Sequence, residues 1–306
     1  MGTPDFALFS LKKLYECGHE IAAVITQPDK PTGRGYVMTP PIVKRWALEK
    51  GLEVYQPKTL KGEEFDSLLK SIDPEIIVVV AFGKILPESV LKYPKYGCIN
   101  VHGSLLPEYR GAAPMQRAII DGKAVTGVTT MYMDVGLDTG DMLLKTEVEI
   151  LPNDNFENIH DKLGEAGAEL LIKTIKGLEE NTIVPEKQDD SLANYAKKIE
   201  KSDCLINFAL DAKTVHNLIR GLSPIPLSFT HTPNGKLLKI VASEVVDESC
   251  QNSAEPGEVV ATDGAITVAC GKGKINLLVV VPEGKSKMNA ADFIRGRKIN
   301  VGDILG

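Results

Sequence analysis

Residues 76–102 read IIVVVAFGKILPESVLKYPKYGCINVH, and this stretch decides the class of fold. Residues 76–81 form a continuous apolar run that predicts a buried strand, and residues 97–102 predict a second one. Between the two, residues 87–93 predict a short helix. Buried strands joined through a helix are typical of a mainly parallel sheet with helices on both faces. We therefore predict an α/β fold for this part of the chain.

The same alternation continues on both sides of this stretch. Periodic segments that predict helices lie at residues 7–17, 44–50, 63–71, 113–121 and 155–179. Apolar, β-branched segments that predict strands lie at residues 21–26, 54–56, 125–133 and 142–150. The first helix follows Gly2-Thr3-Pro4-Asp5, which is typical of a turn after a strand. We expect that the chain either lacks the strand before this turn or starts its sheet with residues 21–26.

The character of the sequence changes near residue 180. Residues 181–202 are polar and show no clear period, which predicts a linker. Beyond them, a helix is predicted at 215–222 and short strands at 227–232, 237–246, 257–261, 265–269 and 275–281. Short strands with frequent turns are typical of a small barrel or sandwich. We predict an α/β domain at 1–182, a linker at 183–202 and a mostly β domain at 203–306.

The composition is that of an ordinary globular protein. The chain has 306 residues, of which 43% are hydrophobic and 25% are charged. Its longest apolar run is strand-sized, well short of the roughly 20 residues that a membrane helix needs. The five cysteines are scattered and form no CxxC pair, which argues against a disulfide framework or a zinc site. We expect a cytoplasmic monomer without a metal cofactor.

Charge is distributed unevenly along the chain. The net charge is -6 at pH 7, yet residues 197–306 contain 14 Lys and Arg against 12 Asp and Glu. The C-terminal part thus carries a net charge of +2, and the remainder carries -8. Such an asymmetry indicates a polyanionic partner for the basic part, and an ordinary solvated surface is the alternative.

Asn100 and His102 are the first candidates for a chemical role. Alternate residues of a strand point to the same side, so these two share one face and Val101 occupies the other. They also end the predicted strand at the edge where open α/β sheets bind ligands. An imidazole transfers protons near neutral pH, and an amide NH2 stabilises a developing oxyanion. The alternative is a structural role for both side chains.

A carboxylate is the third expected member of such a site. Residues 136–141 read GLDTGD, in which Asp138 lies between glycines that permit a close approach of the backbone. Asp141 follows directly, and surface turns have similar sequences. Spacing alone therefore leaves Asp138 and Asp141 as alternatives.

A motif around these residues resembles the signature of the folate-dependent formyltransferases. It reads Asn100-Val-His102-Gly-Ser104-Leu105-Leu106-Pro107-x-x-Arg110-Gly111-x-x-Pro114. Four segments further resemble the branch of that family that acts on initiator tRNA: GTPDF at 2–6, QPDKPTGRG at 27–35, RGAAPMQRAI at 110–119 and DVGLDTGD at 134–141. The resemblance extends essentially from residue 1 to residue 300. It implies a Rossmann-like catalytic domain and an OB-like C-terminal domain that binds tRNA.

The resemblance also implies the reaction and the residues that perform it. A formyl group would pass from 10-formyltetrahydrofolate to the free α-amino group of methionyl initiator tRNA. Asn100, His102 and Asp138 would form the catalytic trio, which favours Asp138 over Asp141. The folate is expected along Ser104, Leu105, Leu106 and Pro107, with its pterin near Phe82, Gly83, Ile85 and Leu86. For Ile85 and Leu86, a plain role in the core is the alternative.

The resemblance implies contacts to tRNA in two places. Residues 29–41, which otherwise predict a surface loop, are expected to enter the acceptor stem through Lys30, Arg34 and Tyr36. In the C-terminal domain, Lys239, Lys272 and Arg295 are expected to contact phosphates, with a solvated charged face as the alternative. Arg110 either positions the acceptor or anchors its own loop.

Two rival interpretations are weighed against this one. In the first, the acceptor is an amino-sugar nucleotide or glycinamide ribonucleotide, although the segment Gln116-Arg117-Ala118 and the basic C-terminal part favour tRNA. In the second, the protein is a nucleotide- or RNA-binding module that transfers no formyl group. The sequence contains no Walker loop and no strand-associated GxGxxG segment that would support this second interpretation.

Overall fold

The computed structural model describes residues 1–32, 36–248, 253–296 and 298–306. The chain forms two compact units, each made of several segments. The first unit contains Met1–Ala112, Val125–Glu149 and His160–Ala196, and the second contains Ala113–Ala124, Ile150–Ile159 and Lys197–Gly306. Within the described ranges, no helix is both long and apolar enough to cross a membrane.

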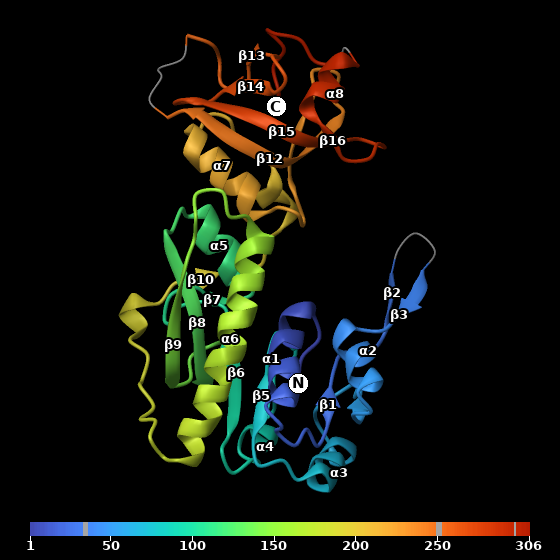
Figure 1. The fold of residues 1–306 in the computed structure, drawn as a ribbon, viewed down its shortest axis with the longest axis vertical. Coiled ribbons are helices and arrows are strands. Elements are labelled where there is room, and N and C mark those ends of the chain that lie inside the picture. Colours follow the sequence, from blue (N-terminus) through green and yellow to red (C-terminus); the bar gives the residue numbers. More distant parts are fainter. Residues whose placement is uncertain (33–35, 249–252, 297) are drawn as a thin grey trace. The chain divides into compact units, whose positions relative to one another are not determined.

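The first unit is built on a sheet whose centre is the strand that carries Asn100 and His102 (Figure 1). Four strands follow one another in the order β5 (Ile77–Val79), β6 (Cys98–His102), β8 (Val125–Tyr132) and β9 (Met142–Glu149). β5 and β6 are parallel, whereas β6 with β8 and β8 with β9 are antiparallel. A separate parallel pair is formed by β1 (Val24–Ile25) and β4 (Val54–Tyr55). The prediction of an α/β sheet is confirmed, with β8 and β9 as its antiparallel members.

Met1 and Gly2 lie between the two groups of strands. The backbone N–H of Gly2 donates to the carbonyl oxygen of Ile25 in β1 at 3.0 Å. On the other side, the N–H of Val80, directly after β5, donates to the carbonyl oxygen of Met1 at 2.9 Å. A cavity of about 400 Å³ adjoins these residues and is lined by apolar side chains that include Leu11 and Ile21. The first two residues thus connect the β1 side of the layer with the β5 side.

Helices cover both faces of this sheet, and the side chains of β6 point alternately to one face and to the other. α6 (Phe156–Glu179) packs on the face of Val101, where a Cβ on Gly167 would be 3.0 Å from a methyl group of Val101. The opposite face holds Cys98, which is buried in one apolar cluster with Leu69 of α3 (Glu63–Ile72) and with Val90. Val90 belongs to α4 (Glu88–Leu91). Asn100 and His102 share the face of Cys98, as the strand period predicts.

α1 and α2 complete the helices of the first unit. α1 (Asp5–Glu16) lies against α6, where Gly164 leaves room for the ring of Phe9. α2 (Ile42–Glu49) buries Val43 and Ala47, and its Trp46 meets Tyr15 of α1 edge to face. The apolar side chains of the two helices are spaced by three or four residues, as their sequences predict.

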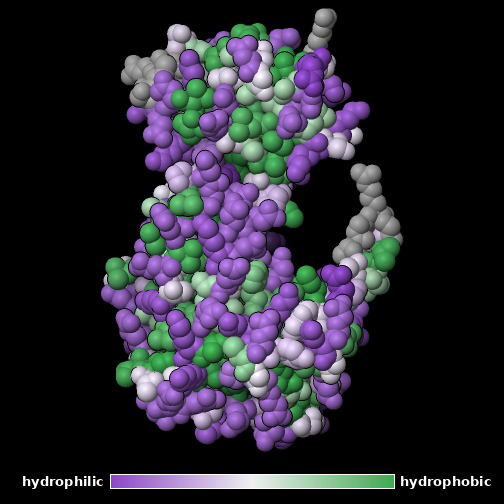
Figure 2. Space-filling view, viewed as in Figure 1, coloured by the Kyte–Doolittle hydropathy of each residue, from purple (hydrophilic) through white to green (hydrophobic). Residues whose placement is uncertain are grey.

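Within segment 29–41, two short strands on either side of the residues that are not described pair with each other, and we call residues 30–32 and 37–39 the hairpin. β2 (Lys30–Thr32) pairs antiparallel with β3 (Val37–Thr39). At its base, Lys44 donates to both carboxylate oxygens of Asp29 at 2.9 Å, and hydrogen bonds from Gln56 and Lys44 lower the pKa of Asp29. Hydrophobic side chains gather on the hairpin, as Figure 2 shows, and Val37 and Met38 are exposed.

The second unit contains a curled antiparallel sheet. Its strands follow the order β11 (Ser228–His231), β12 (Leu237–Asp247), β15 (Lys274–Pro282), β14 (Ile266–Ala269) and β13 (Val259–Ala261), and β16 (Met288–Asn289) pairs with β15. α7 (Ala212–Gly221) and α8 (Ala290–Arg295) bury Ile219 and Phe293 in its core. Register shifts along the pairing of β12 with β15 accompany the curl. The prediction of an OB-like C-terminal part is confirmed. α5 (Pro114–Ile120) also belongs to this unit, where Gly221 of α7 leaves room for Ile120.

The segment predicted as a linker contains short regular elements. These are a 3-10 turn at Asp190–Leu192, β10 (Tyr195–Ala196) and a second 3-10 turn at Lys201–Cys204. β10 pairs in parallel with β7 (Arg110–Gly111), so the part of this segment up to Ala196 packs on the first unit. Two-residue strands are too short to produce a periodic pattern in the sequence.

The burial of the cysteines predicts which thiols react in the native protein. Burial raises the pKa of Cys98 and of Cys270 to about 12, whereas Cys17 is exposed. Since the thiolate is the nucleophile, we expect iodoacetamide at pH 8 to modify Cys17 and to spare Cys98 and Cys270. Peptide mass spectrometry measures this, with the denatured chain as the control. Rapid native modification of Cys98 would contradict the burial. Cys250 lies outside the described residues and is replaced by serine in this experiment.

Candidate active site

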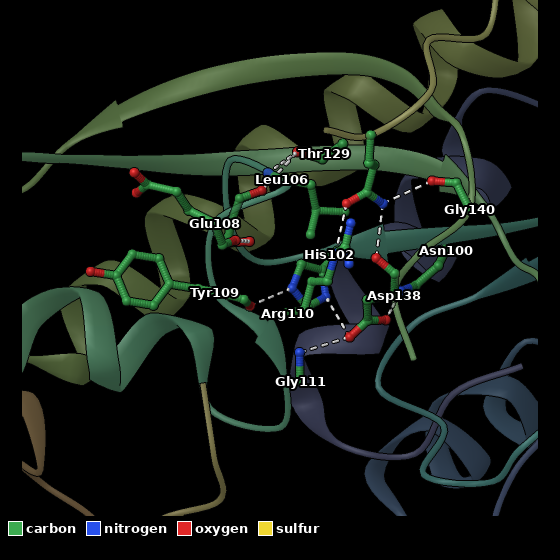
Figure 3. A network of polar contacts seen from close by, with 12 residues as sticks. Asn100, His102, Leu106, Glu108, Tyr109, Arg110, Gly111, Thr129, Asp138 and Gly140 are labelled. Carbon is green, nitrogen blue, oxygen red and sulfur yellow. Dashed lines mark hydrogen bonds and ion pairs between the residues drawn. The ribbon is translucent and has the colours of Figure 1, made fainter. Parts of the chain in front are cut away.

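β6 brings two polar side chains to the end of the central strand. Asn100 is half-buried and His102 is buried. In the register with β8, Asn100 lies opposite Met131 and His102 lies opposite Thr129. Both side chains lie at the C-terminal end of β6. The loop that carries Asp138 approaches the same end of the strand (Figure 3).

The loop that follows β8 supplies the carboxylate. Its turn is closed by Asp134, whose Oδ1 accepts hydrogen bonds from the N–H of Gly136 and the hydroxyl of Thr139, each at 2.8 Å. A Cβ on Gly140 would be only 1.9 Å from the carbonyl oxygen of Tyr132, so this position requires glycine. Asp138 adopts a left-handed backbone with φ of 55°.

The carboxylate of Asp138 faces the two strand residues, as Figure 3 shows. Its Oδ2 accepts the backbone N–H of Gly111 at 2.9 Å and lies 3.7 Å from Nδ1 of His102. Its Oδ1 lies 3.4 Å from Nδ2 of Asn100. Asp141, the alternative acid of the sequence analysis, is exposed to solvent. The structure thus brings Asp138 together with Asn100 and His102.

The second ring nitrogen of His102 is engaged by the backbone. Nε2 lies 3.0 Å from the carbonyl oxygen of Tyr109. A carbonyl oxygen only accepts hydrogen bonds, so Nε2 is the donor in this contact, and Nδ1 is the nitrogen that faces Asp138. A proton on Nδ1 would face Oδ2 of Asp138. The separation of 3.7 Å exceeds a hydrogen bond, and a movement of less than about 1 Å would close it.

The loop after β6 is held from β8. Thr129 donates through its hydroxyl to the carbonyl oxygen of Ser104 at 2.8 Å and accepts the N–H of Leu106 at 3.0 Å. The hydroxyl of Ser104 donates to the carbonyl oxygen of Glu108 at 2.6 Å. Leu106 packs with Met131 and Met142, and the bond between Leu106 and Pro107 is cis. Thr129 was missed by the sequence analysis, because in the sequence it is one β-branched residue among many.

The residues expected around the pterin differ in their exposure. Phe82 and Leu86 are buried in the same apolar cluster as Ile25. Gly83 is exposed, with φ of 75°, and Ile85 is 86% exposed, so the core role considered for Ile85 is wrong. This loop therefore exposes one large apolar side chain, that of Ile85, while the side chains of Phe82 and Leu86 are buried.

Arg110 is placed away from the surface. It is 2% exposed, with Nε donating to Gln188 at 2.9 Å and Nη2 donating to Asp190 at 2.8 Å. Of the two roles considered for Arg110, the geometry corresponds to the anchoring of its own loop. Gln188 also donates through Nε2 to the carbonyl oxygens of Asp138 and Gly140. It was missed because it lies in a polar stretch without a period.

The other residues expected to contact tRNA occur in both units. In segment 29–41, Lys30 is exposed and Tyr36 is 79% exposed, while Arg34 lies outside the described residues. In the second unit, Lys239 is half-buried, Lys272 is exposed, and Arg295 is exposed and hydrogen-bonded to Asp292. Among the residues that the structure describes, no cluster of His, Cys, Asp and Glu has the geometry of a metal site.

Two family models match the chain. The formyl transferase model matches residues 1–175, and the formyl transferase C-terminal domain model matches residues 198–298. The chain is 48% identical to the methionyl-tRNA formyltransferase of Caldanaerobacter subterraneus subsp. tengcongensis and 46% identical to that of Acetivibrio thermocellus. Each comparison covers 100% of this chain and 98% of the relative.

A solved structure shares the fold. It is the N-formyltransferase from Helicobacter canadensis in complex with folinic acid and dTDP-3-aminofucose, with a TM-score of 0.67 and 21% identity. The comparison covers 90% of this chain and 96% of that one. At this identity, the likeness concerns the fold alone.

Proposed function

The chain belongs to the formyl transferase family, and we propose that it transfers the formyl group of 10-formyltetrahydrofolate to methionyl initiator tRNA. The acceptor atom is the free α-amino nitrogen, and the product is formylmethionyl-tRNA for translation initiation. The observation that carries this proposal is the 46–48% identity to methionyl-tRNA formyltransferases over the whole of this chain. Both family models support it, because they match the two parts of the chain separately.

The reaction needs proton transfer and stabilisation of an oxyanion, and no nucleophile from the protein. The α-amino nitrogen attacks the formyl carbon, the bond from that carbon to the folate nitrogen breaks, and the amine proton passes to the folate nitrogen. We assign Asn100 to donate its amide N–H to the tetrahedral oxyanion. His102 accepts the amine proton at Nδ1, because Nε2 already donates to Tyr109, and the resulting imidazolium assists the oxyanion before the proton passes to the folate nitrogen. Asp138 orients the ring and stabilises the imidazolium.

We place the folate along Ser104, Leu105, Leu106 and Pro107, with the pterin near Phe82, Gly83, Ile85 and Leu86. Thr129 supports this placement because it fixes the first of these loops, and the exposed side chain of Ile85 offers an apolar surface to a ring. Phe82 and Leu86 would act by holding the second loop in shape, since their side chains are buried.

We assign the tRNA contacts to segment 29–41 and to the second unit. Lys30, Arg34 and Tyr36 would meet the acceptor stem, and the exposed ring of Tyr36 is suited to stack on a base. Lys239, Lys272 and Arg295 would contact phosphates of the backbone. In this scheme, residues 1–182 form the catalytic domain, 183–202 the linker and 203–306 the tRNA-binding domain. We propose a monomer, because one chain supplies every residue of the proposed site. We propose that it acts in the cytoplasm, because the proposed acceptor is used in translation initiation.

The proposed trio predicts the effect of single substitutions. Asn100→Ala, His102→Ala and Asp138→Ala should each fold, because none of these side chains belongs to an apolar core cluster, yet lose at least about 10²–10³ of kcat. Formylation of methionyl-tRNA under saturating folate measures this, with circular dichroism as the check on folding. Asp141→Asn is the matched control and should keep wild-type turnover. A wild-type rate in any of the three alanine variants removes that residue from the trio.

The acceptor is tested by direct competition. The protein is incubated with 10-formyltetrahydrofolate and, separately, with methionyl initiator tRNA, an amino-sugar nucleotide or glycinamide ribonucleotide. We expect a formylated product only with the tRNA. Formylation of a small amine in preference to tRNA would replace the acceptor and keep the chemistry, whereas the lack of product from every acceptor would contradict the proposal as a whole.

The phosphate contacts predict a salt-dependent affinity for tRNA. Each phosphate contact that is removed should lower the slope of log Kd against log salt by about 1. We therefore expect the triple variant Lys239→Ala, Lys272→Ala, Arg295→Ala to lose about 3 from this slope. Lys12→Ala, an exposed lysine of α1, is the control. A slope that is the same in the triple variant and in the wild type would exclude these residues as phosphate contacts.

A further inference from the structure

We propose that Gln188 is a positioning residue of the formyl-transfer site. Its side-chain amide fixes the backbone of the Asp138 loop and thereby sets where the Asp138 carboxylate stands relative to His102 and Asn100. The kinetic part of this inference rests on the proposed function, whereas the contact itself is a property of the fold.

The amide of Gln188 is fully engaged between two parts of the site. Nε2 donates to the carbonyl oxygens of Asp138 and Gly140, each at 2.8 Å. Oε1 accepts from Nε of Arg110 at 2.9 Å. Carbonyl oxygens only accept and a guanidinium only donates, so these partners fix the orientation of the amide. The side chain is 6% exposed, so water does not compete for these bonds.

The two hydrogen bonds that Gln188 donates bind the part of the loop with the least favourable backbone conformation. Asp138 has φ of 55°, a left-handed conformation that residues with a Cβ rarely adopt. Gln188 binds the carbonyl oxygen of this residue and that of the residue two positions on, and so brackets the strained segment. Strained backbone persists only where surrounding contacts determine it, and these two bonds supply such a determination.

The bonds of Gln188 close a ring through the site, of which Figure 3 labels the members Arg110, Gly111 and Asp138. From Gln188, one path passes through Arg110 to its neighbour Gly111, whose N–H donates to the carboxylate of Asp138. The other path passes from Gln188 directly to the carbonyl oxygen of Asp138. The carboxylate and the backbone of Asp138 are therefore both held by groups that Gln188 binds directly or through Arg110.

Segment 186–196, which carries Gln188, is itself tied to the first unit on both sides of the residue. Before it, Glu186 and Met142 exchange two backbone hydrogen bonds at 2.8 Å. After it, the side chain of Asn194 accepts the N–H of Tyr109, and β10 pairs with β7. Tyr109 is the residue whose carbonyl oxygen holds Nε2 of His102. One segment thus fixes both partners of the His102 ring.

Two variants separate the bonds of Gln188. Gln188→Leu removes all three bonds, whereas Gln188→Glu keeps an acceptor for Arg110 and loses both donors to the loop. Because a displacement of about 1 Å lowers a rate by about 10²-fold, we expect both variants to lose about 10- to 100-fold in kcat, with KM for folate and tRNA within about threefold. Asp190→Asn keeps the acceptor for Arg110 and should retain wild-type kcat. Loss in Gln188→Leu alone would place the role in the Arg110 bond and overturn the proposal.

A double-mutant cycle tests whether Gln188 acts through Asp138. In an Asp138→Ala background, single-turnover measurements should show no further loss from Gln188→Leu, since the carboxylate it positions is gone. Losses that multiply in the double variant would mean a general structural role and would contradict the proposal.

Hydrogen exchange gives a measurement that does not depend on activity. In Gln188→Leu and Gln188→Glu, the amide of Gly111, which donates to Asp138, should exchange at least about tenfold faster. The amides of Arg110 and Ala112, which donate to Asn194 and Ala196, should keep their protection. Unchanged exchange at Gly111, or equal loss at all three amides, would overturn the proposal. If the wild type transfers no formyl group, the proposed function fails. The exchange pattern then still tests whether Gln188 holds the Asp138 loop.

Discussion

The hydrogen bond from the backbone N–H of Gly111 to the carboxylate of Asp138 is the constraint on which the site depends. It requires a glycine, because residue 111 has φ of 114° and a Cβ there would be 3.0 Å from the carbonyl oxygen of Ala196. The absence of a side chain at residue 111 therefore allows both the close approach of β10 to β7 and the hydrogen bond that positions the carboxylate. Asn100 and His102 lie on the central strand β6, and this bond holds the Asp138 loop beside them.

Sequence patterns predicted those parts of the fold that repeat locally. The alternation along β6 is visible in the sequence, so the shared face of Asn100 and His102 followed from the strand period. The curled sheet of the C-terminal part was likewise indicated by short strands and frequent turns. In contrast, β7 and β10 have two residues each, and no period can be recognised over that length.

The rest of the site depends on contacts between distant segments. Asp138 and Asp141 are equivalent in local sequence, and only the family resemblance favoured one of them. In the structure, they are distinguished by a left-handed backbone and by an N–H donated from 27 residues earlier in the chain. Gln188 is separated by 50 residues from the loop that it binds. Such residues carry no local signal, because an isolated glutamine in a polar stretch has the same sequence signature as a solvated one.

In the proposed mechanism, the contact of Nε2 with the carbonyl oxygen of Tyr109 leaves His102 one ring nitrogen, Nδ1, at which to accept and release a proton. With Nε2 engaged, a proton that enters His102 at Nδ1 must leave by the same atom. Under the proposed function, the amine that loses the proton and the folate nitrogen that gains it would both have to reach Nδ1, on the side of the ring that Asp138 faces. The backbone of an adjacent loop would thereby restrict the geometry in which the two proposed substrates can meet.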